Sequence, residues 1–167
     1  MDPPRIFIIS DLHLEYANII KYYHRDQFGD VYEMNSEMVS RWNQTVGKFD
    51  TVYYLGDLVF SRKKRRNIRR WIHKLNGIKI FIWGNHDRYL KCKLPYLVIK
   101  FNGEFLLLVH SPDPEGEHNK ETLAHTGVCE LIKEWKDNRW WIIHGHNHNT
   151  KPEKWLCRKP MEAAVNC

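Results

Sequence analysis

The sequence predicts an α/β fold whose polar residues gather at the ends of successive strands. Two observations predict this fold class: apolar runs of strand length alternate with helical patterns, and five of those runs end in a short polar motif. In chain order, the motifs are Asp11-Leu12-His13, Gly56-Asp57, Gly84-Asn85-His86-Asp87, His110 and Gly145-His146-Asn147-His148.

Each motif follows an apolar run that we interpret as a buried strand. A run of four to eight apolar, β-branched or aromatic residues bounded by glycine and polar residues is typical of such strands. The five runs are Ile6 to Ile9, Val52 to Leu55, Ile78 to Trp83, Phe105 to Val109 and Trp140 to Ile143. The carboxyl ends of strands in an α/β sheet lie along one edge, where ligands bind, so we expect the motifs to converge there.

The residue types in the motifs indicate a metal site. Seven side chains are potential ligands, three through carboxylate or amide oxygen and four through imidazole: Asp11, His13, Asp57, Asn85, His110, His146 and His148. One ion rarely takes seven such ligands, whereas two ions that share a bridging carboxylate could, and two metals about 3.5–4 Å apart serve phosphoester hydrolysis. Mixed oxygen and imidazole donors suit manganese, iron, zinc or nickel better than magnesium or calcium.

The segments between these strands predict helices and one hairpin. The expected helices are Leu14 to Tyr23, Met34 to Val46, Ser61 to Lys74 and Val128 to Trp135. Two apolar runs flank Asn102-Gly103, which is the strongest short-range signal for a hairpin because both residues accept positive φ in a type I′ turn. The second strand of this hairpin leads to His110.

The segment from Ser61 to Lys74 is the most basic part of the chain. It carries eight Lys and Arg residues and no acidic residue, and its apolar residues occupy one helical face. One interpretation is a track for a phosphate backbone, in which each contact adds salt-dependent affinity. The other is a solvated surface helix.

Composition is typical of one packed domain. The chain has 167 residues, 43% of them hydrophobic and 13% aromatic. Its net charge of +6 is compatible with a polyanionic substrate, but solubility alone would explain a charge of this size. The four cysteines show no zinc-finger spacing, and no apolar run is long enough for a signal peptide or a membrane span. We therefore expect a soluble cytoplasmic protein.

The five motifs, in this order, resemble the signature of the calcineurin-like metallophosphoesterases, which reads D-x-H, G-D, G-N-H-D/E, a lone H and G-H-x-H. They extend from residue 11 to residue 148, which is most of the chain. The resemblance implies a single domain over residues 1–167 with a four-layer αββα sandwich, in which two mixed β-sheets are flanked by helices. It also places a dimetal site at the carboxyl ends of the strands.

The resemblance further implies a role for each motif residue. One metal would be held by Asp11, His13, Asp57 and His148, and the second by Asp57, Asn85, His110 and His146, with Asp57 as the bridge. His86 would be a catalytic histidine that binds no metal, oriented by Asp87. The two cofactors would be divalent transition metal ions, Mn²⁺ first, with Ni²⁺, Fe²⁺ or Zn²⁺ as alternatives.

The segment after the first motif resembles that of small phage- and prokaryote-type members of the family. There, a helix that begins Asn-Ile-Ile-Lys precedes an arginine-containing loop near the metals. On this analogy Asn18, His24 and Arg25 would line the substrate end of the site, Arg25 through bidentate contact with phosphate. The alternative is a solvated loop. The remaining length has no room for a cap domain, so the site is expected to be open.

These expectations combine into one functional hypothesis. A metal-bridging hydroxide would attack a phosphodiester of cyclic-nucleotide or nucleic-acid type, and His86 would protonate the leaving oxygen. The alternatives are a phosphomonoesterase that uses the same site, and a metal-stabilised scaffold without catalysis that binds a partner or nucleic acid. The physiological substrate, the diester or monoester preference and the oligomeric state stay open.

Overall fold

Two three-stranded sheets form the centre of the molecule in the computed structural model, which describes residues 3–23, 25–60, 65–91 and 93–146. The first sheet has the order β1-β2-β3 and the second the order β4-β5-β6. The strands are β1 Ile6–Ile9, β2 Thr51–Tyr54, β3 Ile78–Phe81, β4 Leu97–Phe101, β5 Glu104–Val109 and β6 Trp141–His144.

The strand directions bring the motifs to one end of the molecule. In the first sheet β1, β2 and β3 are all parallel, and in the second β5 runs parallel to β6 and antiparallel to β4. Each of the five strands that precede a motif therefore shares its direction with a neighbour in its sheet. Of the two sheets, only the second is mixed over the described strands.

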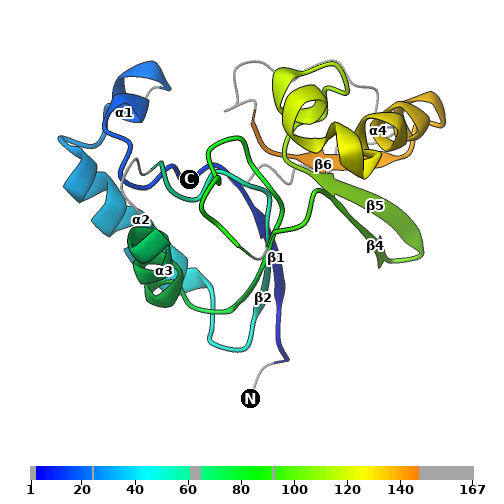
Figure 1. Ribbon diagram of the computed structural model, residues 1–167. Helices are drawn as coiled ribbons and strands as arrows, with labels where there is room; N and C mark the ends of the chain where they lie inside the picture. Colours follow the sequence, from blue (N-terminus) through cyan, green and yellow to red (C-terminus); the bar gives the residue numbers. More distant parts are fainter. Residues whose placement is uncertain (1–2, 24, 61–64, 92, 147–167) are drawn as a thin grey trace.

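Helices cover the outer face of each sheet. They are α1 Asn18–Tyr22, α2 Val31–Thr45, α3 Arg65–Lys74, the π-helix η1 His118–Leu123, the 3-10 helix η2 Ala124–Thr126 and α4 Val128–Asp137. Figure 1 shows α1, α2 and α3 on one side and α4 on the other, with the sheets between them. This is the expected four-layer αββα sandwich. No helix within the described ranges has the length and apolarity to cross a membrane.

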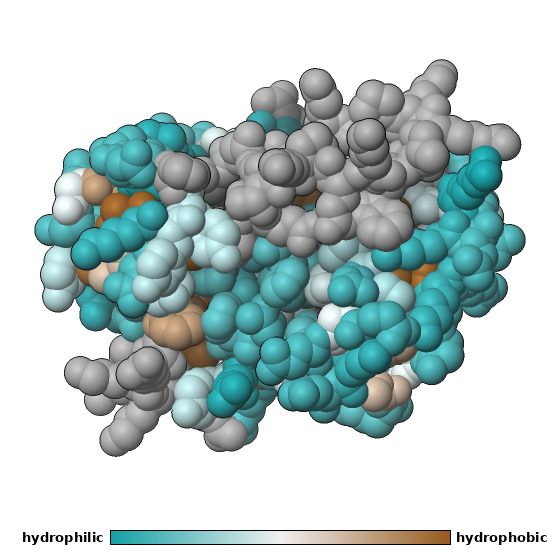
Figure 2. Space-filling model, turned by 90° about the horizontal axis from the view of Figure 1, so that it is seen from above, coloured by the Kyte–Doolittle hydropathy of each residue, from teal (hydrophilic) through white to brown (hydrophobic). Residues whose placement is uncertain are grey.

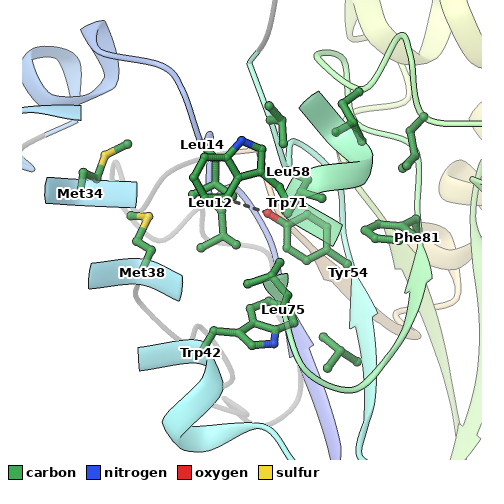
Figure 3. Close-up of a cluster of buried hydrophobic side chains, with 14 of the residues drawn as sticks. Leu12, Leu14, Met34, Met38, Trp42, Tyr54, Leu58, Trp71, Leu75 and Phe81 are labelled. Carbon is green, nitrogen blue, oxygen red and sulfur yellow. Dashed lines mark hydrogen bonds between the residues drawn. The ribbon is translucent and has the colours of Figure 1, made fainter. Parts of the chain in front are cut away.

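The core between α1–α3 and the first sheet also supports the metal centre. Its side chains interlock around Tyr54, whose ring lies 6.1 Å from Trp42 on α2 and 5.7 Å from Phe81 on β3. The Tyr54 hydroxyl accepts a hydrogen bond from the Leu12 amide at 2.9 Å, drawn as a dashed line in Figure 3. The aromatic core is therefore tied directly to the first motif.

The second sheet is buried on both faces along β5, from Leu106 to Val109. Leu106 and Leu108 pack between the two sheets, while Leu107 and Val109 pack on the other face, in the cluster that includes Ile132 of α4. Successive side chains of a strand point to opposite faces, so a continuous apolar run is what a strand buried on both faces requires. This burial fixes the register that delivers His110.

Two local predictions have different outcomes. The hairpin is confirmed: Asn102 and Gly103 have φ values of 49° and 89°, and Phe101 pairs with Glu104. The helix expected from Leu14 begins only at Asn18. Leu14 instead bridges to Val59, and its carbonyl accepts from Phe60, so the chain stays extended beside the second motif.

The basic helix is only partly described. Its apolar face is confirmed, since Ile68, Trp71 and Leu75 are buried, and Arg69 and Arg70 are exposed. Residues 61–64 lie outside the described ranges. A track for nucleic acid along this helix stays a prediction.

Candidate metal centre

The chain turns sharply where the strands deliver their motifs. Asp11, His13, Asp57 and His146 all have positive φ, between 49° and 71°. Residues other than glycine seldom adopt this region, and such strain gathers where function over-determines the backbone. Four of the seven expected ligands thus occupy strained positions at the carboxyl ends of β1, β2 and β6.

Asp57 lies at the centre of the site. Its Oδ2 faces the Nε2 atoms of His110 at 3.5 Å, His13 at 3.6 Å and His86 at 3.8 Å. These separations exceed a good hydrogen bond. They are close to the roughly 3.0–3.4 Å that separates two ligand atoms each about 2.1 Å from a shared cation. The arrangement therefore fits a carboxylate that shares cations with imidazoles.

The other expected ligands surround this carboxylate. His110 Nε2 lies 2.8 Å from Asn85 Oδ1 and 3.2 Å from His146 Nδ1, and His13 Nε2 lies 3.5 Å from Asp11 Oδ1. The structure thus brings six of the seven together, from the ends of five strands; His148 lies outside the described residues. Figure 2 views the molecule from above, and the side chains that it colours are mainly hydrophilic.

Burial and mutual charge set the ionisation of the centre. Burial alone would raise the pKa of Asp57, but the charges of His110, His13 and His86 hold it well below its usual range. Burial opposes ionisation of His110, yet the Asp57 carboxylate raises the pKa of His110 to about 9. Asp57 is therefore a buried anion, and its charge would attract divalent cations to the same place.

The Asp87 carboxylate bonds to the backbone, and no hydrogen bond between it and the His86 ring occurs among the described residues. The carboxylate accepts hydrogen bonds from the backbone amides of Asp57 at 2.8 Å, Gly84 at 3.0 Å and Leu58 at 3.2 Å. The side chain is turned toward the second motif because these three buried amides need an acceptor. Asp87 thus fastens the third motif to the second. The His86 ring is held instead by the edge-on ring of Phe60, 4.7 Å away.

The Arg25 side chain also lies against the backbone, at the first motif. Its guanidinium is buried and donates to the carbonyl of Asp11 at 2.7 Å and to that of Leu12 at 2.9 Å. Two carbonyls of the strained first motif need donors, and a planar guanidinium supplies both. Arg25 is therefore a positioning residue. Asn18 is exposed at the start of α1, with no hydrogen bond to the site among the described residues, and His24 lies outside them.

Two glycines let the second and third motifs approach each other. A Cβ on Gly56, whose φ is 91°, would lie 2.6 Å from His110 Nδ1 and 2.7 Å from the Cα of Gly84. A Cβ on Gly84 would collide with the backbone amide and a carboxylate oxygen of Asp57. Glycine is required here by close approach as well as by φ.

We expect Gly56→Ala to lower the thermal midpoint far more than Gly103→Ala. Both glycines have φ near 90°, so alanine carries the same backbone strain, about 1–2 kcal/mol, at either position. A Cβ on Gly103 meets nothing within 4 Å, whereas a Cβ on Gly56 must displace His110 or Gly84. The difference between the two thermal midpoints measures the cost of fitting a Cβ at Gly56, because the backbone strain is the same in both variants. Equal midpoints would contradict it.

A cavity of about 580 Å³ opens beside the centre. Asn85, His86 and His146 border it, and it extends along η1. His118 is buried in its wall, with Nε2 3.0 Å from the carbonyl of Trp83. Burial lowers the pKa of His118 to about 4, so its ring is neutral at pH 7. Arg88 also lines the cavity, and its place directly after the third motif was a signal that could have found it.

Comparisons with known proteins agree with this geometry. The family model described as calcineurin-like phosphoesterase matches residues 4–163. The uncharacterized protein MJ1445 of Methanocaldococcus jannaschii is 36% identical over 166 residues, which are 99% of this chain and 82% of that protein. The gene 66 protein of Mycobacterium phage D29 is 31% identical over 161 residues, covering 86% of this chain and 78% of the phage protein.

A solved structure shows the same fold. The protein of unknown function AQ665 from Aquifex aeolicus superposes with a TM-score of 0.65 and 24% identity, over 93% of this chain and 85% of that one. The family match spans nearly the whole chain, and its residues converge on Asp57 as the motif order predicts. The chain belongs to the calcineurin-like phosphoesterase family.

Proposed function

We propose that this protein hydrolyses phosphodiesters at a two-metal centre bridged by Asp57. One observation carries the proposal. The ligand atoms form two groups, His13–Asp57–His86 and Asp11–Asp57–His110, and the atoms of each group lie within 4.8 Å of one another. Asp57 belongs to both groups, which is the arrangement that a bridging carboxylate requires.

The proposed ligand sets follow the family assignment. One ion would be held by Asp11, His13, Asp57 and His148, and the other by Asp57, Asn85, His110 and His146. The close groups divide the residues differently, because Asp11 lies with His110 and His13 lies with His86. Divalent cations bound here supply Lewis-acid activation of water and of phosphoryl oxygens. Mn²⁺ is the proposed native metal, since mixed imidazole and carboxylate ligands suit it.

The residues of the chain have separate tasks in this proposal. Two divalent cations against the Asp11 and Asp57 carboxylates leave two positive charges, which suits a hydroxide and a monoanionic diester. His86, whose side chain is 32% exposed, borders both the centre and the cavity, so it can give a proton to the leaving oxygen. Asp87 fixes the loop that carries it.

Metal-stripped protein is expected to be inactive toward bis(p-nitrophenyl) phosphate, and Mn²⁺ is expected to restore turnover. Mass spectrometry of the native complex should then count two ions per chain. The same assay with p-nitrophenyl phosphate measures the diester preference, which we expect to be about tenfold or more. If two ions bind and none of Mn²⁺, Ni²⁺, Fe²⁺ or Zn²⁺ restores turnover, the catalytic proposal fails. Faster hydrolysis of p-nitrophenyl phosphate than of the diester would overturn only the diester preference.

A further inference from the structure

The cavity beside the metal centre is large enough to hold a substituent of the substrate. Its volume of about 580 Å³ falls within the range of small-molecule sites. The metal-centre residues Asn85, His86 and His146 border it, so a phosphate at the metals would lie at its mouth. What fills the rest of the cavity is decided by its other walls.

The position of His86 identifies which part of the substrate enters. If His86 protonates the leaving oxygen, as the proposed function holds, then the residues around His86 surround the leaving group. Arg88 and Tyr89 follow His86 on the same loop, and the Phe60 ring packs against it at 4.7 Å. All three residues line the cavity. The cavity is therefore the leaving-group side of the site.

Aromatic surface is available on this side. Tyr89 is 45% exposed. Phe60 is half-buried, and its ring packs against that of Tyr16, 4.1 Å away. Trp83 is less accessible, because Lys93 Nζ lies 3.7 Å from its ring centroid. Tyr89 and Phe60 can thus contact a flat group, and a base stacks on such rings whatever its sequence.

Another part of the lining is acidic. Glu117 and Glu121 line the cavity four residues apart, at the start of η1, and both are exposed. The charged side chains among the described lining residues, Glu117, Glu121 and Arg88, sum to one negative charge, and Lys93, whose Nζ covers the Trp83 ring, lies outside this set. Carboxylates accept hydrogen bonds from N–H and O–H groups and repel any additional phosphate.

We propose that this cavity binds the leaving alcohol as a single nucleoside that carries no second phosphate. The base lies against Tyr89 and Phe60, and amino or hydroxyl donors of the nucleoside meet Glu117 and Glu121. Water supplies the oxygen that joins phosphorus, the bond from phosphorus to the nucleoside oxygen breaks, and that oxygen takes a proton. Cyclic nucleotides and dinucleoside monophosphates satisfy this rule, whereas the interior of a polynucleotide does not.

A cationic amino alcohol such as choline is the competing occupant, since aromatic rings and carboxylates also attract a quaternary ammonium. Two features favour the nucleoside. Arg88 adds a positive charge to the same cavity, and the volume of about 580 Å³ is large for so small a cation. A binding test separates the two, because it does not depend on hydrolysis.

Calorimetry on the full-length chain, with and without Mn²⁺, should show guanosine binding at least about tenfold more tightly than choline. Guanosine is the probe because its base edge presents adjacent N–H donors. Tyr89→Ala should weaken guanosine at least about fivefold. Tyr32→Ala, which removes an 80% exposed tyrosine of α2, should leave its affinity unchanged. Tighter binding of choline, or no effect of Tyr89→Ala, overturns the proposal.

Hydrolysis tests the exclusion of a second phosphate. A dinucleoside monophosphate from which guanosine leaves through its 5′-oxygen is compared with the same diester phosphorylated on the guanosine 3′-oxygen. We expect kcat/KM for the phosphorylated diester to be at least about tenfold lower than for the unphosphorylated one. In the Glu117→Gln/Glu121→Gln variant, this ratio of kcat/KM values should fall below about threefold. Glu130→Gln on α4 is the matched control and should keep the ratio.

The two arms keep the proposals distinguishable. Equal cleavage of both diesters, or a ratio that persists in the double variant, overturns the nucleoside assignment while bis(p-nitrophenyl) phosphate is still hydrolysed. If no diester is hydrolysed with any metal, the proposed function fails. Guanosine binding then still decides what the cavity holds.

Discussion

Asp57→Asn is expected to lower kcat/KM toward bis(p-nitrophenyl) phosphate by at least roughly 10²–10³-fold and to reduce bound metal below two ions per chain. Asparagine keeps the shape of the side chain, and its oxygen can still accept the His86 amide, which lies 2.9 Å from Asp57 Oδ1. It removes the negative charge that faces three imidazoles within 3.8 Å. The loss of activity and metal therefore reports the missing negative charge and bridge, and not a disturbed His86 loop.

Asp50→Asn is the matched control for this variant. Asp50 is also buried, and it accepts hydrogen bonds from the amides of Arg5 and Gly47 at 2.7 Å and 2.8 Å. It lies at the amino end of β2, at the opposite end of the strand from Asp57. We expect Asp50→Asn to lower the thermal midpoint without changing the metal count. An Asp57→Asn protein that keeps two ions and full activity would contradict the bridge.

The convergence of the motifs could be predicted because it depends on strand direction alone. A strand that ends in Asp57 or His110 delivers that residue to the carboxyl edge whatever the rest of the chain does. The hairpin was equally local, since Asn102-Gly103 selects its own turn. The four-layer architecture was predicted in another way, from the family resemblance that the five motifs carry.

The roles of Arg25 and Asp87 could not be predicted, because they depend on where backbone groups point. An arginine near a phosphate site and an aspartate after a catalytic histidine have obvious polar roles. In the fold, Arg25 donates hydrogen bonds to the carbonyls of Asp11 and Leu12. Asp87 accepts a hydrogen bond from the amide of Asp57. Sequence gives the identity of a charged side chain, whereas tertiary structure decides whether it serves backbone or substrate.

The cavity was missed for a further reason, which is distance along the chain. Phe60, Tyr89 and Glu121 meet there from three segments, and no periodic pattern joins them. His118 belongs to none of the five motifs, and the π-helix η1 places it in the cavity wall. Long-range packing of irregular segments leaves little signal in one sequence.

His86→Ala is expected to lower kcat by about 10²-fold on bis(p-nitrophenyl) phosphate and by more on a dinucleoside monophosphate. A nucleoside is a poorer leaving group than p-nitrophenol, so its oxygen depends more on the proton that His86 gives. His73→Ala, which removes an exposed histidine of α3, should change neither rate more than about twofold.

The metal count of the His86→Ala protein separates two roles. His86 Nε2 lies 3.8 Å from Asp57 Oδ2, close enough for this histidine to be grouped with His13 and Asp57 as a ligand. A proton donor can be removed while two ions stay bound, whereas loss of a ligand lowers metal affinity. Two ions retained, with a defect that grows as the leaving group becomes poorer, is the result expected of a general acid. Loss of one ion, with an equal fall in kcat on both substrates, would show that His86 is a metal ligand. Another group would then have to protonate the leaving oxygen.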